Sequence, residues 1–286
     1  MIKVENVNYI YQKGMPSEHQ ALFDINLEIP DGSLTALIGH TGSGKSTLIQ
    51  HFNALIKPTS GKITVDDIDI TDSKTDLKLI RRKVGLVFQY PEHQLFEETV
   101  YKDIAFGPKN IGIAEDEIDE RVRLSAEAVG LKEKYLERSP FELSGGQKRR
   151  VAIAGILAMN PKALILDEPT AGLDPKGRED ILRLIKRLHE QNKDMIIIFV
   201  SHSMEDVAKT AEHVIVMNEG RIETEGSVPL IFAKTKLLRS IGLNVPQITL
   251  LAEKIRAAGY DLPEDIYTVK DAAKAIKEFI GGSKNV

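Results

Sequence analysis

The strongest signal in the chain is the segment Gly39-His40-Thr41-Gly42-Ser43-Gly44-Lys45-Ser46-Thr47. An apolar run (34–38) precedes it, and a helical stretch begins near Lys45. This order of strand, glycine loop and helix is the context in which such a segment binds phosphate. The glycines allow positive φ angles and carry no Cβ, so successive N–H groups can converge on an oxyanion, and the helix start adds the positive end of its dipole. The segment therefore predicts a nucleotide-phosphate site.

Two side chains of this segment are suited to a bound triphosphate. Lys45 can reach the β and γ phosphates, and the Ser46 hydroxyl can serve as an oxygen ligand to Mg²⁺. The alternative is a glycine turn with a surface lysine, which the strand-to-helix setting disfavours. By itself the segment indicates nucleotide phosphates and no particular reaction.

The length and composition set broad limits. A chain of 286 residues can form one large domain, or a large domain with an appendage. Its 38 basic and 42 acidic residues give a net charge of −4, which offers no overall attraction to nucleic acid or anionic lipid. Cysteine is absent, which excludes disulfides and thiol catalysis. The first residues lack the apolar core of a signal peptide, and the longest apolar stretches (151–159 and 195–200) fall short of the roughly 20 residues that span a bilayer. We expect a soluble protein that reaches a membrane only by attachment to another protein.

The residues before the glycine loop read as strands. Alternating apolar residues from Ile2 to Ile29 predict short strands with a polar loop (12–20) between them. Tyr11 ends the first of these strands. It can serve sheet packing, or it can stack on an adenine ring because the phosphate loop is near.

The pattern changes after the glycine-loop helix, which is expected to end before Pro58. Strand-like pieces follow at 62–70 and 83–88, and the second ends in Gln89. Residues 91 to about 155 then read as mainly helical, with apolar positions recurring every three or four residues in 116–129. An α-helical insertion within an α/β domain is therefore expected.

A second candidate anion-binding device stands at Ser144, Gly145, Gly146 and Gln147, where a helix begins. Its ordinary interpretation is a helix cap. One chain seldom needs two such devices for one triphosphate, so the second suggests a nucleotide that is held by another subunit.

Two short apolar strands deliver polar residues at their carboxyl ends. The strand at 163–166 leads to Asp167 and Glu168, and the strand at 195–200 leads to His202. Strands that alternate with helices in this way predict a mainly parallel sheet with its site along one edge.

The polar residues at this edge have candidate roles. Asp167 can hold Mg²⁺ directly or through water, and Glu168 can accept a proton from the attacking water or orient it. Gln89 can ligate the metal and hold the water, and His202 can donate to the γ-phosphate. A solvated acidic turn, a plain strand-ending glutamine and a structural histidine are the respective alternatives.

The residues beyond Gly226 form a candidate second domain. Helices are expected at 229–241, 246–258 and 269–279, and no chemical motif occurs among them. Their apolar faces suggest contact between subunits of a dimer.

Residues 1 to about 226 resemble the ATP-binding cassette of ABC transporters. The resemblance rests on the glycine loop, Gln89, the signature 143–147, the acidic strand end 164–168, the loop 171–174 and His202. It implies an α/β P-loop NTPase fold of the RecA-like kind, with an antiparallel β subdomain, the helical insertion at about 91–155 and the C-terminal helical extension 227–286. It also implies a head-to-tail dimer around two ATP molecules with Mg²⁺, each between one subunit's glycine loop and the other's signature, and Tyr11 as the adenine-stacking residue.

Finer features are similar to the ATPase subunits of energy-coupling factor (ECF) transporters, which take up vitamins and trace nutrients in prokaryotes. They are the segments 89–110 and 140–159, the helical tail, and, for the second of the two related ATPases, residues 18–23 with the glycine loop. The resemblance implies three partners at the cytoplasmic face of the membrane: a sister ATPase, a transmembrane T component whose coupling helices meet 89–106, and a substrate-binding S component. Two alternatives stay open. The first is a soluble ATPase that acts on nucleic acid or ribosomes, although such a protein is expected to have a long coiled-coil insertion or two tandem cassettes, and this sequence has neither. The second is a binding module without turnover.

Overall fold

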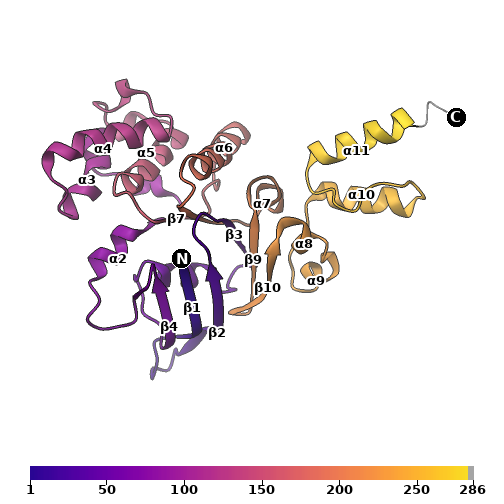
Figure 1. The fold of residues 1–286 in the computed structure, drawn as a ribbon, viewed down its shortest axis with the longest axis horizontal. Helices are drawn as coiled ribbons and strands as arrows, with labels where there is room; N and C mark the ends of the chain where they lie inside the picture. The colour runs from indigo at the N-terminus through magenta and orange to yellow at the C-terminus, as the bar shows by residue number, and fades with distance from the viewer. Residues whose placement is uncertain (283–286) are drawn as a thin grey trace.

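The computed structural model describes residues 1–282 as two sheets with helices around them (Figure 1). The antiparallel sheet has the order β2-β1-β4-β5. Its strands are β1 (Ile2–Tyr11), β2 (His19–Ile29), β4 (Ser60–Val65) and β5 (Ile68–Asp69). The predicted strand at 62–70 is in fact a hairpin, because Asp66 and Asp67 both adopt positive φ, +51° and +64°.

The larger sheet has the order β10-β9-β3-β8-β7-β6, and β9, β3, β8, β7 and β6 are parallel. Its strands are β3 (Leu34–Ile38), β6 (Val84–Val87), β7 (Ala163–Asp167), β8 (Ile196–Val200), β9 (His213–Asn218) and β10 (Arg221–Ser227). The predicted parallel sheet is confirmed. The hairpin β9–β10 was not predicted.

The large sheet separates two hydrophobic cores because side chains alternate between its faces. On β8, Ile197 and Phe199 join the core under the helices, whereas Ile196, Ile198 and Val200 join the core against the antiparallel sheet. Apolar burial on both faces explains why this strand reads as a continuous apolar run. It also fixes the register of the polar residues that follow the strand.

Helices cover the large sheet. In the cassette they are α1 (Lys45–Phe52), α2 (Leu77–Lys83), α3 (Val100–Asn110), α4 (Glu115–Ala128), α5 (Gly145–Leu157), α6 (Pro175–Gln191) and α7 (Met204–Thr210), with short 3₁₀ turns at η1 (Pro91–His93), η2 (Glu133–Tyr135) and η3 (Pro140–Glu142). Helices α3, α4 and α5 come between strands β6 and β7 in the chain and pack on one another. No helix within residues 1–282 is long and apolar enough to cross a bilayer.

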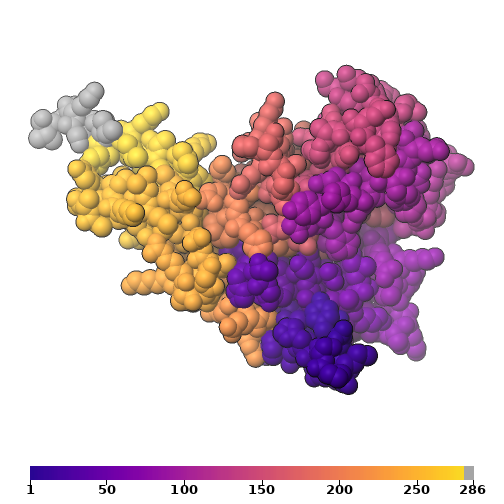
Figure 2. Space-filling view, turned by 180° about the vertical axis from the view of Figure 1, so that it is seen from behind, coloured from indigo at the N-terminus to yellow at the C-terminus, as the bar shows by residue number. Residues whose placement is uncertain are grey.

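The tail holds α8 (Val228–Phe232), α9 (Thr235–Ser240), α10 (Gln247–Ala257) and α11 (Val269–Gly282). The prediction of a single helix at 229–241 was wrong, because this segment forms the two helices α8 and α9. It breaks after Phe232, and Phe232 and Leu238 are then both fully buried in the cassette core. Helices α10 and α11 enclose a small core of their own. They project at the end of the molecule opposite the α3–α5 layer (Figures 1 and 2).

Candidate active site

Four loops meet at the carboxyl edge of the parallel strands. Strands β3, β8, β7 and β6 are neighbours in that order. The glycine loop follows β3, His202 follows β8, Asp167 and Glu168 end β7, and Gln89 follows β6. The sheet order therefore places these candidate residues side by side, as the sequence predicted.

The glycine loop wraps around the Lys45 ammonium group. Lys45 is 5% exposed, and its Nζ donates to the carbonyl oxygens of Gly39 at 2.8 Å and His40 at 2.9 Å. Burial lowers the pKa of Lys45, and the nearby Glu168 and Asp167 act in the opposite direction. Ser46 is exposed at the first turn of α1, where its hydroxyl is accessible to a ligand.

The loop is shaped to accept an oxyanion. Gly42 and Gly44 have φ of +84° and +98°, which favours glycine, and a Cβ added at Gly42 would meet nothing within 4 Å. At Gly39 an added Cβ would lie 2.4 Å from both Met217 O and Ser43 Oγ. The loop is thus closed on its inner side and open on its outer side, which fits a phosphate group there.

Glu168 has unusual backbone and side-chain environments. Its φ of +49° lies in the left-handed region, where a non-glycine residue is strained, and such strain concentrates at functional sites. Burial, together with the charge of Asp167, raises the pKa of the Glu168 carboxyl to about 7. Its Oε1 is buried and makes no hydrogen bond within residues 1–282, although His202 Nε2 lies 3.2 Å away. A carboxyl in this state can exchange a proton near neutral pH.

The raised pKa of Glu168 should make the stability of the nucleotide-free protein depend on pH. The folded chain binds more protons than the unfolded chain between the ordinary value, 4.5, and about 7, so the free energy of unfolding falls as pH rises through this window. Glu168→Gln removes that loss. We expect the free energy of unfolding of the variant to exceed that of the wild type by up to about 3 kcal/mol near pH 8 and by close to zero near pH 4. Urea unfolding measures this difference.

The exposed Glu190→Gln on α6 is the matched control for the loss of a carboxyl group. A stability difference for Glu168→Gln that stays constant across this pH range would contradict the raised pKa.

The other candidate residues at this edge are His202, Asp167 and Gln89. Burial, with the charge of Lys45, lowers the pKa of His202. Burial raises the pKa of Asp167. Gln89 is exposed beyond β6. The structure thus brings Lys45, Glu168 and His202 into one electrostatic group.

Tyr11 lies beside the helix that follows the glycine loop. Its hydroxyl is 3.0 Å from Thr47 Oγ1, and its ring meets the Tyr9 ring edge-to-face at 4.7 Å. The side chain is 37% exposed, so a flat ligand can reach its ring. The contact with Thr47 was not predicted, because it joins residues 36 positions apart.

The second predicted device lies at the start of α5. Ser144 caps the helix in a capping box with Gln147, since each accepts a hydrogen bond from the other's backbone N–H. Added Cβ atoms at Gly145 and Gly146 would meet nothing within 4 Å. These residues line a cavity of about 430 Å³ together with Gly172, Leu173 and Asp174. No residue of the glycine loop lines this cavity.

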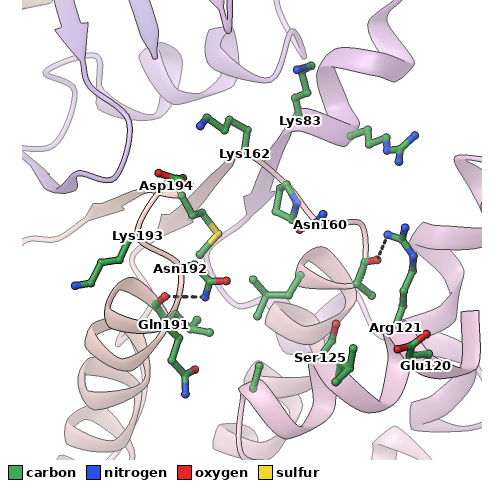
Figure 3. Close-up of a pocket in the computed structure, with 18 of the residues that line it drawn as sticks. Lys83, Glu120, Arg121, Ser125, Asn160, Lys162, Gln191, Asn192, Lys193 and Asp194 are labelled. Atoms are coloured by element: carbon green, nitrogen blue, oxygen red, sulfur yellow. Dashed lines mark hydrogen bonds between the residues drawn. The ribbon is translucent and has the colours of Figure 1, made fainter. Parts of the chain in front are cut away.

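A larger cavity, of about 1020 Å³, lies at the other edge of the sheet (Figure 3). Lys83, Lys162 and Asp194 in its wall come just before β6, β7 and β8 and so mark the amino ends of these strands. Its wall carries charges of both signs, and the glycine loop, Glu168 and the signature do not line it. The candidate active site is therefore at the carboxyl edge and not in this larger cavity.

The comparisons with known proteins agree with this site. Residues 22–171 match the family model described as ABC transporter. The chain is 58% identical over 285 residues to the energy-coupling factor transporter ATP-binding protein EcfA2 of Caldanaerobacter subterraneus subsp. tengcongensis, covering 100% of this chain and 99% of that protein. EcfA2 of Clostridium perfringens is 59% identical over 280 residues, 98% of each chain. The chain belongs to the energy-coupling factor branch of the ABC transporter ATP-binding proteins.

Solved structures of ABC cassettes have the same fold. CbiO1 from Clostridium perfringens, part of the ABC transporter complex cbiONQ, is 42% identical with a TM-score of 0.75, over 88% of this chain and 98% of that one. The dimeric cassette MJ0796 bound to ADP and Pi is 32% identical with a TM-score of 0.70, over 80% and 99%. This ABC cassette therefore binds and hydrolyses ATP, and the predicted α/β cassette fold is confirmed. The alternative of a soluble ATPase acting on nucleic acid or ribosomes has no support.

Proposed function

We propose that this cassette is the motor of a membrane transporter for vitamins or trace nutrients, and that it works in a head-to-tail pair with a related ATPase subunit. One observation carries the proposal. The glycine loop and the signature each have the features of an anion-binding site, yet the cavity that the signature lines includes no residue from 39–47. Each ATP then lies between the glycine loop of one subunit and Ser144 of the other. ATP binding closes the pair, and hydrolysis opens it.

The residues at the carboxyl edge would divide the work of hydrolysis. Glu168 orients the attacking water or takes its proton, and His202 donates to the γ-phosphate. Lys45 neutralises the β and γ phosphates. Tyr11 stacks on the adenine ring. The remaining nucleotide contacts come from the glycine loop (39–47) and from the signature residues Ser144, Gly145, Gly146 and Gln147.

A Mg²⁺ ion would be held by Ser46, Gln89 and Asp167. Hydroxyl, amide and carboxylate oxygens suit this hard cation, and the exposed Ser46 hydroxyl can reach a ligand in the open side of the loop. When bound, the ion supplies charge neutralisation on the phosphates.

The membrane partner would dock on residues 89–106, and the complex would lie at the cytoplasmic face of the membrane. Phe96 and Phe106 are 59% and 42% exposed and meet edge-to-face at 4.9 Å, which leaves an aromatic pair open to a partner. A transmembrane T component fits this surface, and a separate S component would choose the nutrient.

Phe96→Glu should lower capture of the membrane partner at least tenfold while ATP binding stays near normal, because a charge in an aromatic contact costs well over about 1.4 kcal/mol. Pull-down from detergent-solubilised membranes measures the capture. Leu124→Glu, an exposed apolar residue of α4, is the control. Recovery of ribosomes or DNA with no integral membrane protein would reject the transport function itself.

We also propose the division into a cassette (1–226) with its helical insertion (about 91–155) and an extension (227–286) that contacts the second ATPase. Exposed Leu251 and Ile276 on α10 and α11 support such a contact. Since α8 and α9 place Phe232 and Leu238 in the cassette core, a deletion that tests the contact should begin after α9. Unchanged pairing without α10 and α11 would contradict this role of the extension.

A further inference from the structure

Arg149 is a charged side chain that the fold buries almost completely, with 1% of it exposed. It lies on α5, five residues after Ser144. Its Nη1 donates to the carbonyl oxygens of Pro169 at 2.8 Å and Ala171 at 2.9 Å. Its Nη2 lies 3.0 Å from both carboxylate oxygens of Glu92. One guanidinium group therefore joins three segments that are far apart in the sequence.

Each of the three segments carries a candidate part of the ATPase site. Glu92 lies in η1, three residues after Gln89. Pro169 and Ala171 directly follow Glu168, and the N–H of Ala171 donates to Glu168 O at 3.1 Å. The helix that carries Arg149 begins at the signature, which lines the cavity of about 430 Å³.

A second contact links two of these loops directly. A Cβ added at Gly172 would lie 3.2 Å from Cε1 of the Tyr90 ring, and Gly172 has a φ of +72°. The loop after Gln89 and the loop after Glu168 thus touch beside the Arg149 hydrogen bonds. Displacement of either loop must disturb the other.

Stability alone does not explain a buried ion pair at this point. Apolar residues of similar volume stabilise a fold as well as a buried ion pair does, or better. A guanidinium instead offers donors in a fixed planar fork, which sets the relative positions of its acceptors. The Nε atom of Arg149 finds no partner within residues 1–282, so the group is not placed to satisfy all of its donors.

We propose that Arg149 is a positioning residue for ATP hydrolysis. It holds the backbone after Glu168 and the loop after Gln89 in fixed register with the Ser144 end of α5. The catalytic carboxylate of one half-site and the signature of the other half-site then move as one unit when a partner displaces residues 89–93. This inference rests on the roles proposed above for Glu168 and Ser144.

Arg149→Met should lower kcat about 10- to 100-fold and change KM by less than about threefold, because the nucleotide contacts remain and only the alignment of the reacting groups is lost. The single variant also leaves the partly buried Glu92, whose side chain is 18% exposed, without its partner and so should be less stable. The double variant Arg149→Met, Glu92→Leu removes both charges. We expect it to recover the wild-type midpoint of urea unfolding while its kcat stays at least tenfold low. Arg187→Met, which removes an exposed arginine that also donates to a carbonyl, Ala128 O at 2.8 Å, should leave kcat unchanged.

The assay measures ATP turnover by the assembled transporter in vesicles. Recovery of kcat together with stability in the double variant would overturn the proposal, since the pair would then serve the fold alone. An unchanged kcat in Arg149→Met would do so too. Glu168→Gln in the same assay separates the catalytic role of Glu168 from the positioning role of Arg149. Wild-type turnover by Glu168→Gln would contradict the catalytic role. Slow turnover by Glu168→Gln together with wild-type turnover by Arg149→Met would contradict only the positioning role.

Discussion

Glutamine in place of Glu168 should slow ATP turnover roughly 10²–10⁴-fold, because the substitution keeps the shape of the side chain and removes only its ability to accept a proton. The affinity for ATP should stay near that of the wild type, and the paired state should persist longer, since hydrolysis is the step that opens it. Single-turnover hydrolysis and equilibrium nucleotide binding measure the two quantities separately.

The exposed Glu190→Gln removes the same charge from α6 and should leave the rate unchanged. Near-normal turnover by Glu168→Gln would assign the base to another group. His202, whose Nε2 is 3.2 Å from Glu168 Oε1, would then be the first candidate.

Arginine in place of Ser144 should abolish turnover and leave ATP binding by the isolated subunit near normal. The long side chain would fill the cavity of about 430 Å³ at the start of α5, where the partner's nucleotide is proposed to lie. The glycine loop lines none of that cavity, so the subunit's own nucleotide contacts are not touched.

Ser144→Ala is the matched control because it removes the same hydroxyl without adding bulk. It loses the cap to the Gln147 N–H, at a cost of about 1 kcal/mol, and should retain measurable turnover. Loss of ATP binding and turnover together in the isolated Ser144→Arg subunit would show that the signature serves its own subunit's nucleotide.

The sequence predicted the parts of the site that follow from strand order. Each of Gly39, Asp167 and His202 comes at the carboxyl end of an apolar strand, and parallel strands bring such ends to one edge. The positive φ of Glu168 and its raised pKa could not be predicted, because both depend on burial by neighbouring loops.

Contacts between residues far apart in the chain could not be predicted from the sequence either. Arg149 and Glu92 are 57 residues apart, and their spacing carries no periodic or motif signal. Helix α2 was missed, although Asp76 caps it by accepting from the Lys78 N–H at 2.9 Å. An Asp directly before the apolar-basic run 77–83 was the available signal. The break between α8 and α9 follows from burial of Phe232 and Leu238, which only the packed fold reveals.

The dependence of ATP turnover on subunit pairing tests the central claim most directly. Turnover per subunit would be measured on dilution of the ATPase pair while light scattering reports its mass. We expect the rate per subunit to fall in step with the loss of the paired species, because each ATP needs the glycine loop of one subunit and the signature of the other. A constant, brisk rate from a population that scattering shows to be fully monomeric would contradict the account.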